Sequence, residues 1–460
     1  MFKSIADTFA NCFKIPELKS RILFTLMLLA VCRLVAWIPV PGLDGAQLKA
    51  WFDANQAAAA GSVLGMYSLF TGGAIQKCAV GALGIMPYIT ATIIIQLLTT
   101  VVGSLQKLAR EEGGRAQIVK YGRYLTVLLC VGQGIFMTLG WENPEKVFPG
   151  FVGDLVFPGM NLWWYRIQTV IMLTTGTLLL MWLGEQITER GIGNGISLVI
   201  TIGIVADLPM AAQGFIEMFF PGKGIEARYN YFVLIFLAAL LVIVVGAVVA
   251  VTQAQRKIPV QYAQRAVGRK IFQGGSSFMP LRVNAAGVMP IIFAQAILMF
   301  PAMLLVKAGQ VFDMKAIEGA GHQLERGHWT YYALYTLMIL FFSYFWVATQ
   351  FNEVQVADDL KKHGGYIPGV RPGQATSDFL HRAMSRITLA GAIFLTVIAL
   401  VPQLMGQWFN INQSVSQFFG GTSMLITVGV LLDTMRQMET HLLMRHYDGF
   451  LKKGRVKGRF

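Results

Sequence analysis

Ten long apolar stretches constrain what this chain can fold into more than any other feature of its sequence. They lie near residues 22–40, 78–102, 121–140, 164–184, 195–218, 230–251, 284–306, 331–350, 386–405 and 418–437. As a helix, each is long enough to cross a hydrocarbon layer about 30 Å thick. Hydrophobic residues make up 55% of the 460 positions and charged residues only 13%, a composition that a soluble domain of this size cannot bury. The sequence therefore predicts an all-α polytopic membrane protein with ten transmembrane helices.

Lysine and arginine are distributed unequally among the segments that connect these stretches. If the N-terminus is placed in the cytoplasm, 28 of the 38 basic residues fall on the cytoplasmic side, 9 on the outer side, and Arg33 within the first stretch. This bias follows the positive-inside rule. Because an even number of spans returns the chain to its starting side, we expect both termini in the cytoplasm.

A short phrase occurs twice, as GIMPYI at 84–89 and as GVMPII at 287–292. Its copies fall in the second and seventh stretches, and an odd separation means that the two spans cross in opposite directions. This pattern is typical of an inverted repeat, whose interface usually holds the functional pathway. Because proline frees backbone groups that something else must satisfy, we expect Pro87 and Pro290 to weaken both helices within the span and to mark helices that line a cavity.

The apolar stretches contain few ionisable residues, with Arg33 in the first and Asp433 near the end of the tenth. A transporter for ions or polar solutes normally carries such residues at mid-membrane, so their scarcity disfavours that class. Three classes remain open at this point: a pore through which a chain passes, a secondary transporter, and a membrane scaffold without a pore.

Isoleucines recur at helical spacing in two places. Ile85 and Ile89 are four residues apart, as are Ile196 and Ile200, so each pair shares one helix face. Ile292 occupies the position of Ile89 in the second copy of the phrase. A ring of branched apolar side chains at a constriction excludes water and ions by dewetting, although ordinary core or lipid contacts explain the same spacing.

No catalytic signature is present in the sequence. It contains no HExxH motif and no nucleophile elbow, and its four cysteines, Cys12, Cys32, Cys78 and Cys130, lack CxxC spacing. We therefore expect neither an enzymatic activity nor a cofactor.

Three connecting segments are unusual. The cytoplasmic segments 252–283 and 351–386 are long for connections between spans, and the first is basic with interleaved apolar residues. These features indicate docking to a large acidic partner, with RNA as a candidate. The apolar segment 61–78 is too short to span and is interrupted at Thr71-Gly72-Gly73, so it is either a surface helix or a re-entrant segment.

Seven separated stretches resemble signature sequences of the SecY family, the channel subunits of the bacterial protein-conducting translocase. They read FTGGA, ALGIMPYITATIIIQLL, GEQITERGIGNGIS, QRKIPVQYA, VNAAGVMP, GVRPG and FGGTS, in the family's order. The resemblance implies ten transmembrane helices in two inverted five-helix halves around an hourglass pore, in the bacterial inner membrane. The implied segments are an N-terminal segment 1–21, halves at 22–220 and 221–440, and a basic tail 441–460.

The resemblance also implies four groups of functional residues. The pore ring of the family falls on Ile85, Ile89, Ile196, Ile200, Ile292 and Ile426. Its lateral gate falls between spans 2–3 and 7–8, with Pro87, Gln96, Asn284 and Pro290. The plug falls on 62–77 and includes Phe70, Thr71, Gly72 and Gly73. Docking residues for the motor ATPase SecA or the ribosome fall on Arg256, Lys257, Arg265 and Arg371.

The partners that the resemblance implies are the subunits SecE and SecG, SecA, the ribosome with its rRNA, the signal sequences of preproteins, and membrane lipids. Three positions depart from the family's usual pattern. Thr252 and Ala254 stand where an acidic residue and a glycine are common, and Glu353 stands where a proline is common. All three lie in or beside the docking segments, so they bear on the affinity for partners more than on the channel.

Overall fold

The computed structural model describes most of the chain. The described residues are 15–55, 67–68, 70–111, 113–148, 150–219, 231–262, 265–267, 270–272, 275–311, 314–324, 327–408 and 422–453. Two compact units divide the chain. The first, called here the N-unit, comprises Met1–Glu217, Asn412–Ser414 and Val430–Phe460, and the C-unit comprises Met218–Ile411 and Val415–Gly429.

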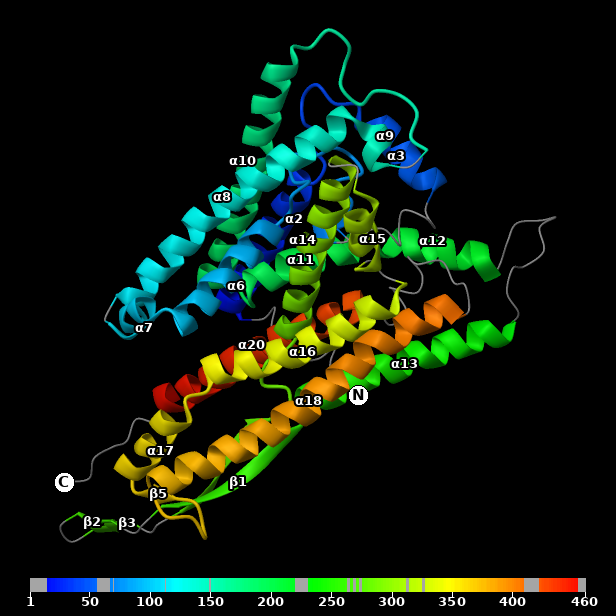
Figure 1. Cartoon of the computed structure of the whole chain (residues 1–460). Helices are drawn as coiled ribbons and strands as arrows, with labels where there is room; N and C mark the ends of the chain where they lie inside the picture. Colours follow the sequence, from blue (N-terminus) through cyan, green and yellow to red (C-terminus); the bar gives the residue numbers. More distant parts are fainter. Residues whose placement is uncertain are drawn as a thin grey trace. The chain divides into compact units, whose positions relative to one another are not determined.

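Helices dominate both units (Figure 1). Those before residue 220 are α2 (Pro16–Val35), α3 (Gly45–Ala54), α6 (Met86–Val101), α7 (Gly103–Arg110), α8 (Gly114–Glu142), α9 (Pro144–Val147), α10 (Leu162–Arg190), α11 (Gly195–Ala206) and α12 (Leu208–Phe219). The later ones are α13 (Tyr231–Gln253), α14 (Met289–Val311), α15 (Lys315–Gln323), α16 (Trp329–Gln350), α17 (Glu353–Lys362), α18 (Gln374–Trp408) and α20 (Thr422–Lys453). Helix therefore occurs in each of the ten apolar stretches, which confirms the predicted α-helical membrane class.

Five helical segments in the described part of the chain are long and apolar enough to cross a membrane by themselves: Gly114–Glu142, Leu162–Arg190, Val233–Gln253, Trp329–Lys362 and Gln374–Val401. A sixth span results if α6 and α7, which meet at an angle of 102°, are taken together. Gly195–Ala206 and Met289–Leu298 are shorter apolar helices.

The repeated phrase begins a helix in both copies, and the expectation that it weakens the helix interior is wrong. α6 starts at Met86 and α14 at Met289, so Pro87 and Pro290 lie in the first helical turn. Proline fits that turn because its missing N–H would have no intrahelical partner there. The glycines before it, Gly84 and Gly287, have φ values of +57° and +64°. The proline that does lie inside α14 is Pro301.

The core of the N-unit includes the packed helix pair α8 and α10. Two bidentate ion pairs join these helices at separate levels. Arg123 donates to both carboxylate oxygens of Glu185 at 3.1 and 2.8 Å, and Arg166 does the same to Glu142 at 2.9 and 2.8 Å. Because planar guanidinium and carboxylate groups match in two hydrogen bonds, these pairs fix the register of the two helices.

In the C-unit, α16 packs against both α14 and α18, and Figure 1 shows α16 and α18 side by side. The C-unit also contains strands, which the sequence analysis did not predict: β1 (Gln255–Tyr262), β2 (Arg265–Val267), β3 (Lys270–Phe272), β4 (Ser276–Arg282) and β5 (Gly365–Tyr366). They form an antiparallel sheet in the order β4-β1-β5 and a separate hairpin of β2 and β3.

Candidate functional site

The two long cytoplasmic segments predicted to dock partners meet in one sheet. β1 belongs to the first segment and pairs with β5 of the second, with Gln261 opposite Tyr366 and Tyr262 opposite Gly365. The Tyr366 hydroxyl donates a hydrogen bond to Gln261 Oε1 at 3.0 Å. We call the sheet, α17 and the first turns of α18 the docking platform.

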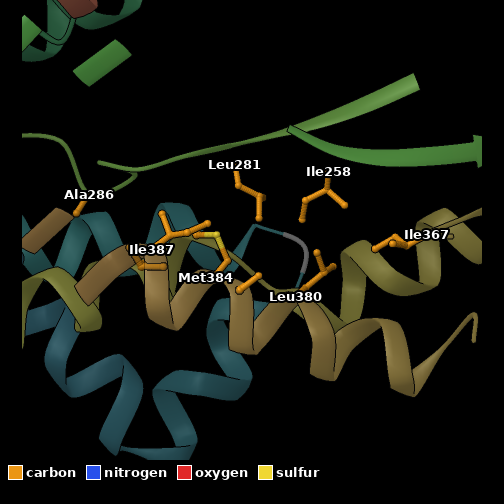
Figure 2. Close-up of a cluster of buried hydrophobic side chains, with 9 residues drawn as sticks. Ile258, Leu281, Ala286, Ile367, Leu380, Met384 and Ile387 are labelled. Atoms are coloured by element: carbon orange, nitrogen blue, oxygen red, sulfur yellow. The ribbon is translucent and has the colours of Figure 1, made fainter. Parts of the chain in front are cut away.

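An apolar cluster fixes the platform to the helices beneath it. Alternate residues of the strands face inward, since Ile258 and Leu281 are buried whereas Phe278, three residues before Leu281 on β4, is 61% exposed. Figure 2 shows Ile258 and Leu281 pointing from the strands toward side chains of α18. The buried members of the cluster are Ile258, Leu281, Ala286, Val347, Ile367, Leu380, Ala383, Met384 and Ile387. Burial of these side chains stabilises the sheet by packing it against α16 and α18, whereas an isolated hairpin would be only marginally stable.

The platform presents basic side chains to solvent. Arg256 and Lys257 in β1 are exposed, and so is Arg371 in the loop between β5 and α18. That loop is held at both ends, because Ile367 is buried in the cluster and the Thr376 hydroxyl donates to the Arg371 carbonyl at 2.9 Å. The side chain of Arg265, in β2, lies outside the described part of the chain. Three of the four predicted docking residues are thus exposed on one unit.

Glu353, one of the departures from the family pattern, has a clear structural role. It is the first residue of α17, where the Asn352 side chain accepts the Gln355 N–H at 3.1 Å and so caps the helix. Proline and acidic residues both suit the first helical turn. Glu353 also contacts His381 of α18, with Oε1 at 3.1 Å from Nδ1. The substitution therefore keeps the helix start and adds a link between α17 and α18.

The other two departures lie where α13 leads into β1. The Thr252 hydroxyl donates to the Val248 carbonyl at 2.8 Å, within α13. The Ala254 carbonyl accepts the Val283 N–H at 2.9 Å, which closes the base of the β1–β4 hairpin. Both contacts are local, and neither needs an acidic residue or a glycine.

A compact turn in the N-unit contains the predicted plug residues. Of the segment 62–77, residues 62–66 and 69 lie outside the described part of the chain. Phe70 and Thr71 are buried, and the Gly73 N–H and the Thr71 hydroxyl both donate to the Ser68 carbonyl, at 3.0 and 3.1 Å. Gly72 and Gly73 have φ values of +61° and +77°, which L side chains rarely adopt.

The chain after this turn is tied to the end of α2. The Val80 N–H donates to the Ile38 carbonyl at 2.8 Å, and the Val40 N–H donates to the Cys78 carbonyl at 2.9 Å. The Tyr67 hydroxyl donates to the Leu83 carbonyl at 2.8 Å. Hydrogen bonds therefore join the segments on both sides of the turn to each other and to the end of α2. This arrangement favours the re-entrant alternative over a simple surface helix.

The glycine cluster GIGNG, 191–195, forms the junction of α10 and α11. Three of its backbone N–H groups are taken up by side chains: Ile192 donates to Thr25 Oγ1 at 3.1 Å, Gly193 to Gln437 Oε1 at 2.8 Å, and Gly195 to Thr188 Oγ1 at 2.9 Å. The acceptors come from α2, α20 and α10. This junction fixes the start of α11, which carries Ile196 and Ile200.

The comparisons with known proteins agree with these features. A model of the SecY family matches residues 79–435. The protein translocase subunit SecY of Chlamydia trachomatis is 41% identical, covering 98% of this chain and 99% of its own length. The same subunit of Thermotoga maritima is 42% identical with the same coverage, and that of Escherichia coli K12 is 41% identical over 96% of both chains.

The chain belongs to the SecY family.

Solved structures of similar fold support this assignment. A structure described as a protein conducting channel has a TM-score of 0.62, at 19% identity, covering 95% of this chain and 94% of its own. Sec61 in a canine ribosome-channel complex from the endoplasmic reticulum has a TM-score of 0.57, also at 19% identity and with the same coverage. At this identity the likeness shows the fold, which is that of a multi-pass membrane protein of the SecY type.

The residues predicted to form the SecY pore ring divide between the units. Ile85, Ile89 and Ile200 of the N-unit are buried, and Ile196 is partly exposed. Ile292 and Ile426 of the C-unit are buried. Ile85 immediately precedes α6, and the Ile89 N–H donates to its carbonyl at 3.2 Å, so the predicted stacking of these two residues on one helical turn is present.

The two polar residues predicted for the lateral gate each leave a buried atom unsatisfied. Gln96 Oε1 and Asn284 Nδ2 have no hydrogen-bond partner among the described residues. Such atoms are uncommon in folded proteins and mark positions where a water or an incoming group can bind. Their role in a SecY gate stays a prediction.

The sequence analysis missed two features of this SecY-family chain. It treated Arg33 as an isolated charge and did not name Asp207, although Arg33 binds the turn at Gly72 and Gly73, called here the plug turn after the prediction, and Asp207 lies near it. It also treated 252–283 as a loop and predicted no strands in it. The alternation of Ile258, Val260 and Tyr262 along QRKIPVQY was the signal for a strand.

Proposed function

We propose that this chain is a protein-conducting channel. In this proposal it passes unfolded polypeptides across the membrane and releases transmembrane segments sideways into lipid. The observation that carries it is the match of about 41% identity, over nearly the whole chain, to proteins described as protein translocase subunits. No chemical step is assigned to the channel, and its energy comes from translation or from SecA.

The proposed path runs between the halves 22–220 and 221–440. Ile85, Ile89, Ile196, Ile200, Ile292 and Ile426 form the apolar constriction that excludes water and ions while a chain is absent. An apolar signal helix inserts between spans 2–3 and 7–8, where Gln96 and Asn284 lie. Burial of its apolar face against lipid and channel supplies the driving force, at about 25 cal/mol per Å². Opening of this gate displaces the plug.

The proposed partners fall into two sets. The exposed residues Arg256, Lys257 and Arg371 of the docking platform receive SecA or the ribosome, including rRNA phosphates, because basic side chains neutralise such charges. Arg265 is proposed to join them. SecE and SecG assemble with the chain in the membrane, which is proposed to be the bacterial inner membrane with both termini in the cytoplasm. The surplus of basic residues on that side supports the orientation.

Site-specific photocross-linking to a stalled preprotein tests this function. A photoreactive residue at Ile89 in α6 or at Ile292 in α14 should cross-link to the signal sequence. The matched control is Leu128 in α8, a residue that is 67% exposed in the structure and that should face lipid. Absence of cross-links from both helices, together with saturable uptake of a small solute by vesicles containing the chain, would instead identify a secondary transporter.

A further inference from the structure

Two charged residues of the N-unit remain without a role in the proposed function. Arg33 lies in the last turn of α2, and Asp207 follows the last residue of α11. Ionisable residues within or at the ends of membrane spans are costly and are normally retained for a specific partner. Arg33 has such a partner in the turn at Gly72 and Gly73, and Asp207 interacts electrostatically with Arg33.

Arg33 binds the plug turn directly. Its Nη1 donates a hydrogen bond to the Gly72 carbonyl at 3.2 Å. The contact is also closely packed, because a Cβ on Gly72 would collide with the same nitrogen and would lie 2.9 Å from the Cα of Gly203 in α11. Gly72 is thus enclosed between the ends of α2 and α11, in a space that only glycine fits.

Asp207 lies on the other side of the same turn. Its backbone N–H donates to carbonyls of the last turn of α11, which fixes the residue at the helix end. Its Oδ1 lies 3.9 Å from the position that a Cβ on Gly73 would occupy. Its carboxylate interacts electrostatically with Arg33 and with Lys77, which follows the turn. The two glycines therefore lie near one acidic and two basic side chains.

Lys77 is held in place by a further contact. Its Nζ lies 3.2 Å from the centroid of the Trp37 ring, which belongs to the segment after α2. This cation–π contact keeps the second cation beside Asp207. Residues of α2, α11 and the plug segment consequently form one charged cluster around Gly72 and Gly73.

We propose that Arg33 and Asp207 are positioning residues that hold the Gly72–Gly73 turn in the closed channel. This inference rests on the proposed function, because it assigns the cluster the task of retaining the plug. Displacement of the plug must break the charged hydrogen bond to the Gly72 carbonyl, and such bonds are stronger in a partly dehydrated site than in water. Both side chains are only partly buried, so water can replace the bond once the turn moves away.

The test compares resting ion conductance with the export of a reporter whose signal sequence is defective. The full chain is used, with the subunits that co-purify with it. Arg33→Gln removes the cation and Asp207→Asn removes the anion at nearly constant volume. Arg166→Gln is the matched control, because it makes the same substitution at an arginine of the N-unit whose partner is Glu142 and which is remote from the turn in sequence. A deletion of residues 67–73 reports the conductance of a channel without the turn.

We expect Arg33→Gln to raise resting conductance and defective-signal export about tenfold, the loss expected for one charged hydrogen bond. Asp207→Asn should raise both as well, because it removes the charge that interacts with Arg33. Arg166→Gln should leave both unchanged. A merely structural defect would lower export, so a gain in both readouts is specific to release of the plug. If both variants keep the wild-type resting conductance while the deletion variant conducts, this inference is wrong and the proposed function is unaffected. A rise in Arg33→Gln only would remove Asp207 from the inference. A deletion variant that does not conduct would instead contradict the proposed pore.

Discussion

Gly84 and Gly287 adopt φ values of +57° and +64°, a region that L side chains rarely enter. A Cβ on Gly84 would also lie 3.0 Å from Thr71 Cγ2, in the plug turn. At Gly287, no heavy atom of the described residues lies within 4 Å of the corresponding position. The two copies of the phrase therefore share a backbone conformation but differ in packing, and Gly84 lies close to Thr71 of the predicted plug.

Polar substitution of the isoleucine ring is expected to loosen the closed channel. An amide in Ile89→Asn or Ile426→Asn lowers the cost of hydrating a dewetted constriction. Export of a reporter with a defective signal sequence should rise about tenfold, equivalent to roughly 1.4 kcal/mol of closed-state preference. Ile89→Leu is the control, because it keeps the apolar volume. Wild-type export and wild-type ion leak in both Asn variants would argue against the ring.

Charge reversal at Arg371 is expected to impair SecA-driven translocation. Its loop is anchored by Ile367 and Thr376, so the exposed guanidinium is presented from a fixed position. Arg371→Glu places a like charge against an acidic partner, and ATP-dependent transport into vesicles should fall about tenfold or more. Membrane insertion of the channel should be unaffected.

Arg382→Glu provides the comparison for Arg371→Glu, because Arg382 is also exposed on the platform but lies on α18. Equal loss in both variants would indicate a general effect of charge. Normal transport by Arg371→Glu would remove Arg371 from the docking site.

At the scale of elements, the docking platform depends on α18. Leu380 is fully buried in the cluster beneath the sheet, whereas Leu389 on the same helix is 44% exposed. Two segments that are far apart in sequence, β1 and β5, are held in register above this helix. The support for both docking loops therefore comes from one apolar cluster.

Leu380→Ala should destabilise the platform by about 2–5 kcal/mol, the usual cost of a large-to-small change in a core. Protease cleavage within 252–283 should become faster, and binding of SecA or ribosomes should weaken. Leu389→Ala serves as the control on the same helix and should behave as wild type. Equal protease resistance of the two variants would show that the cluster does not support the sheet.

At the scale of the whole molecule, the formal net charge of +14 is distributed with most basic residues in the segments assigned to the cytoplasm. Electrostatic attraction of this kind supplies affinity for polyanions and weakens as counterions compete. The docking platform is one described part of that basic surface. Its exposed arginines and lysines act there as phosphate-binding groups in the proposed function.

Binding to ribosomes should therefore fall steeply with salt, by about tenfold or more between roughly 50 and 200 mM. Co-sedimentation of vesicles with ribosomes measures this dependence, with an uncharged osmolyte of equal osmolarity as the control. Arg371→Glu should reduce the slope of log affinity against log salt by about 1 or more. Affinity that does not change with salt would contradict phosphate recognition by the platform.

The sequence by itself determined the class of fold and the family. The length of each apolar stretch and the charge of each connecting segment depend on whether lipid or water surrounds that segment. Because this is a local property, the α-helical membrane class could be predicted from the sequence. The start of a helix at Pro87, rather than a weakened interior, depended on backbone angles at Gly84 that composition does not reveal.

Only the tertiary structure decided which distant residues meet. The pairing of Gln261 with Tyr366 and the bond from Arg33 to Gly72 join segments that the chain separates widely. Such contacts are selected by the packing of whole helices and not by local propensity. A single sequence contains the residues that make these contacts but does not show which of them meet.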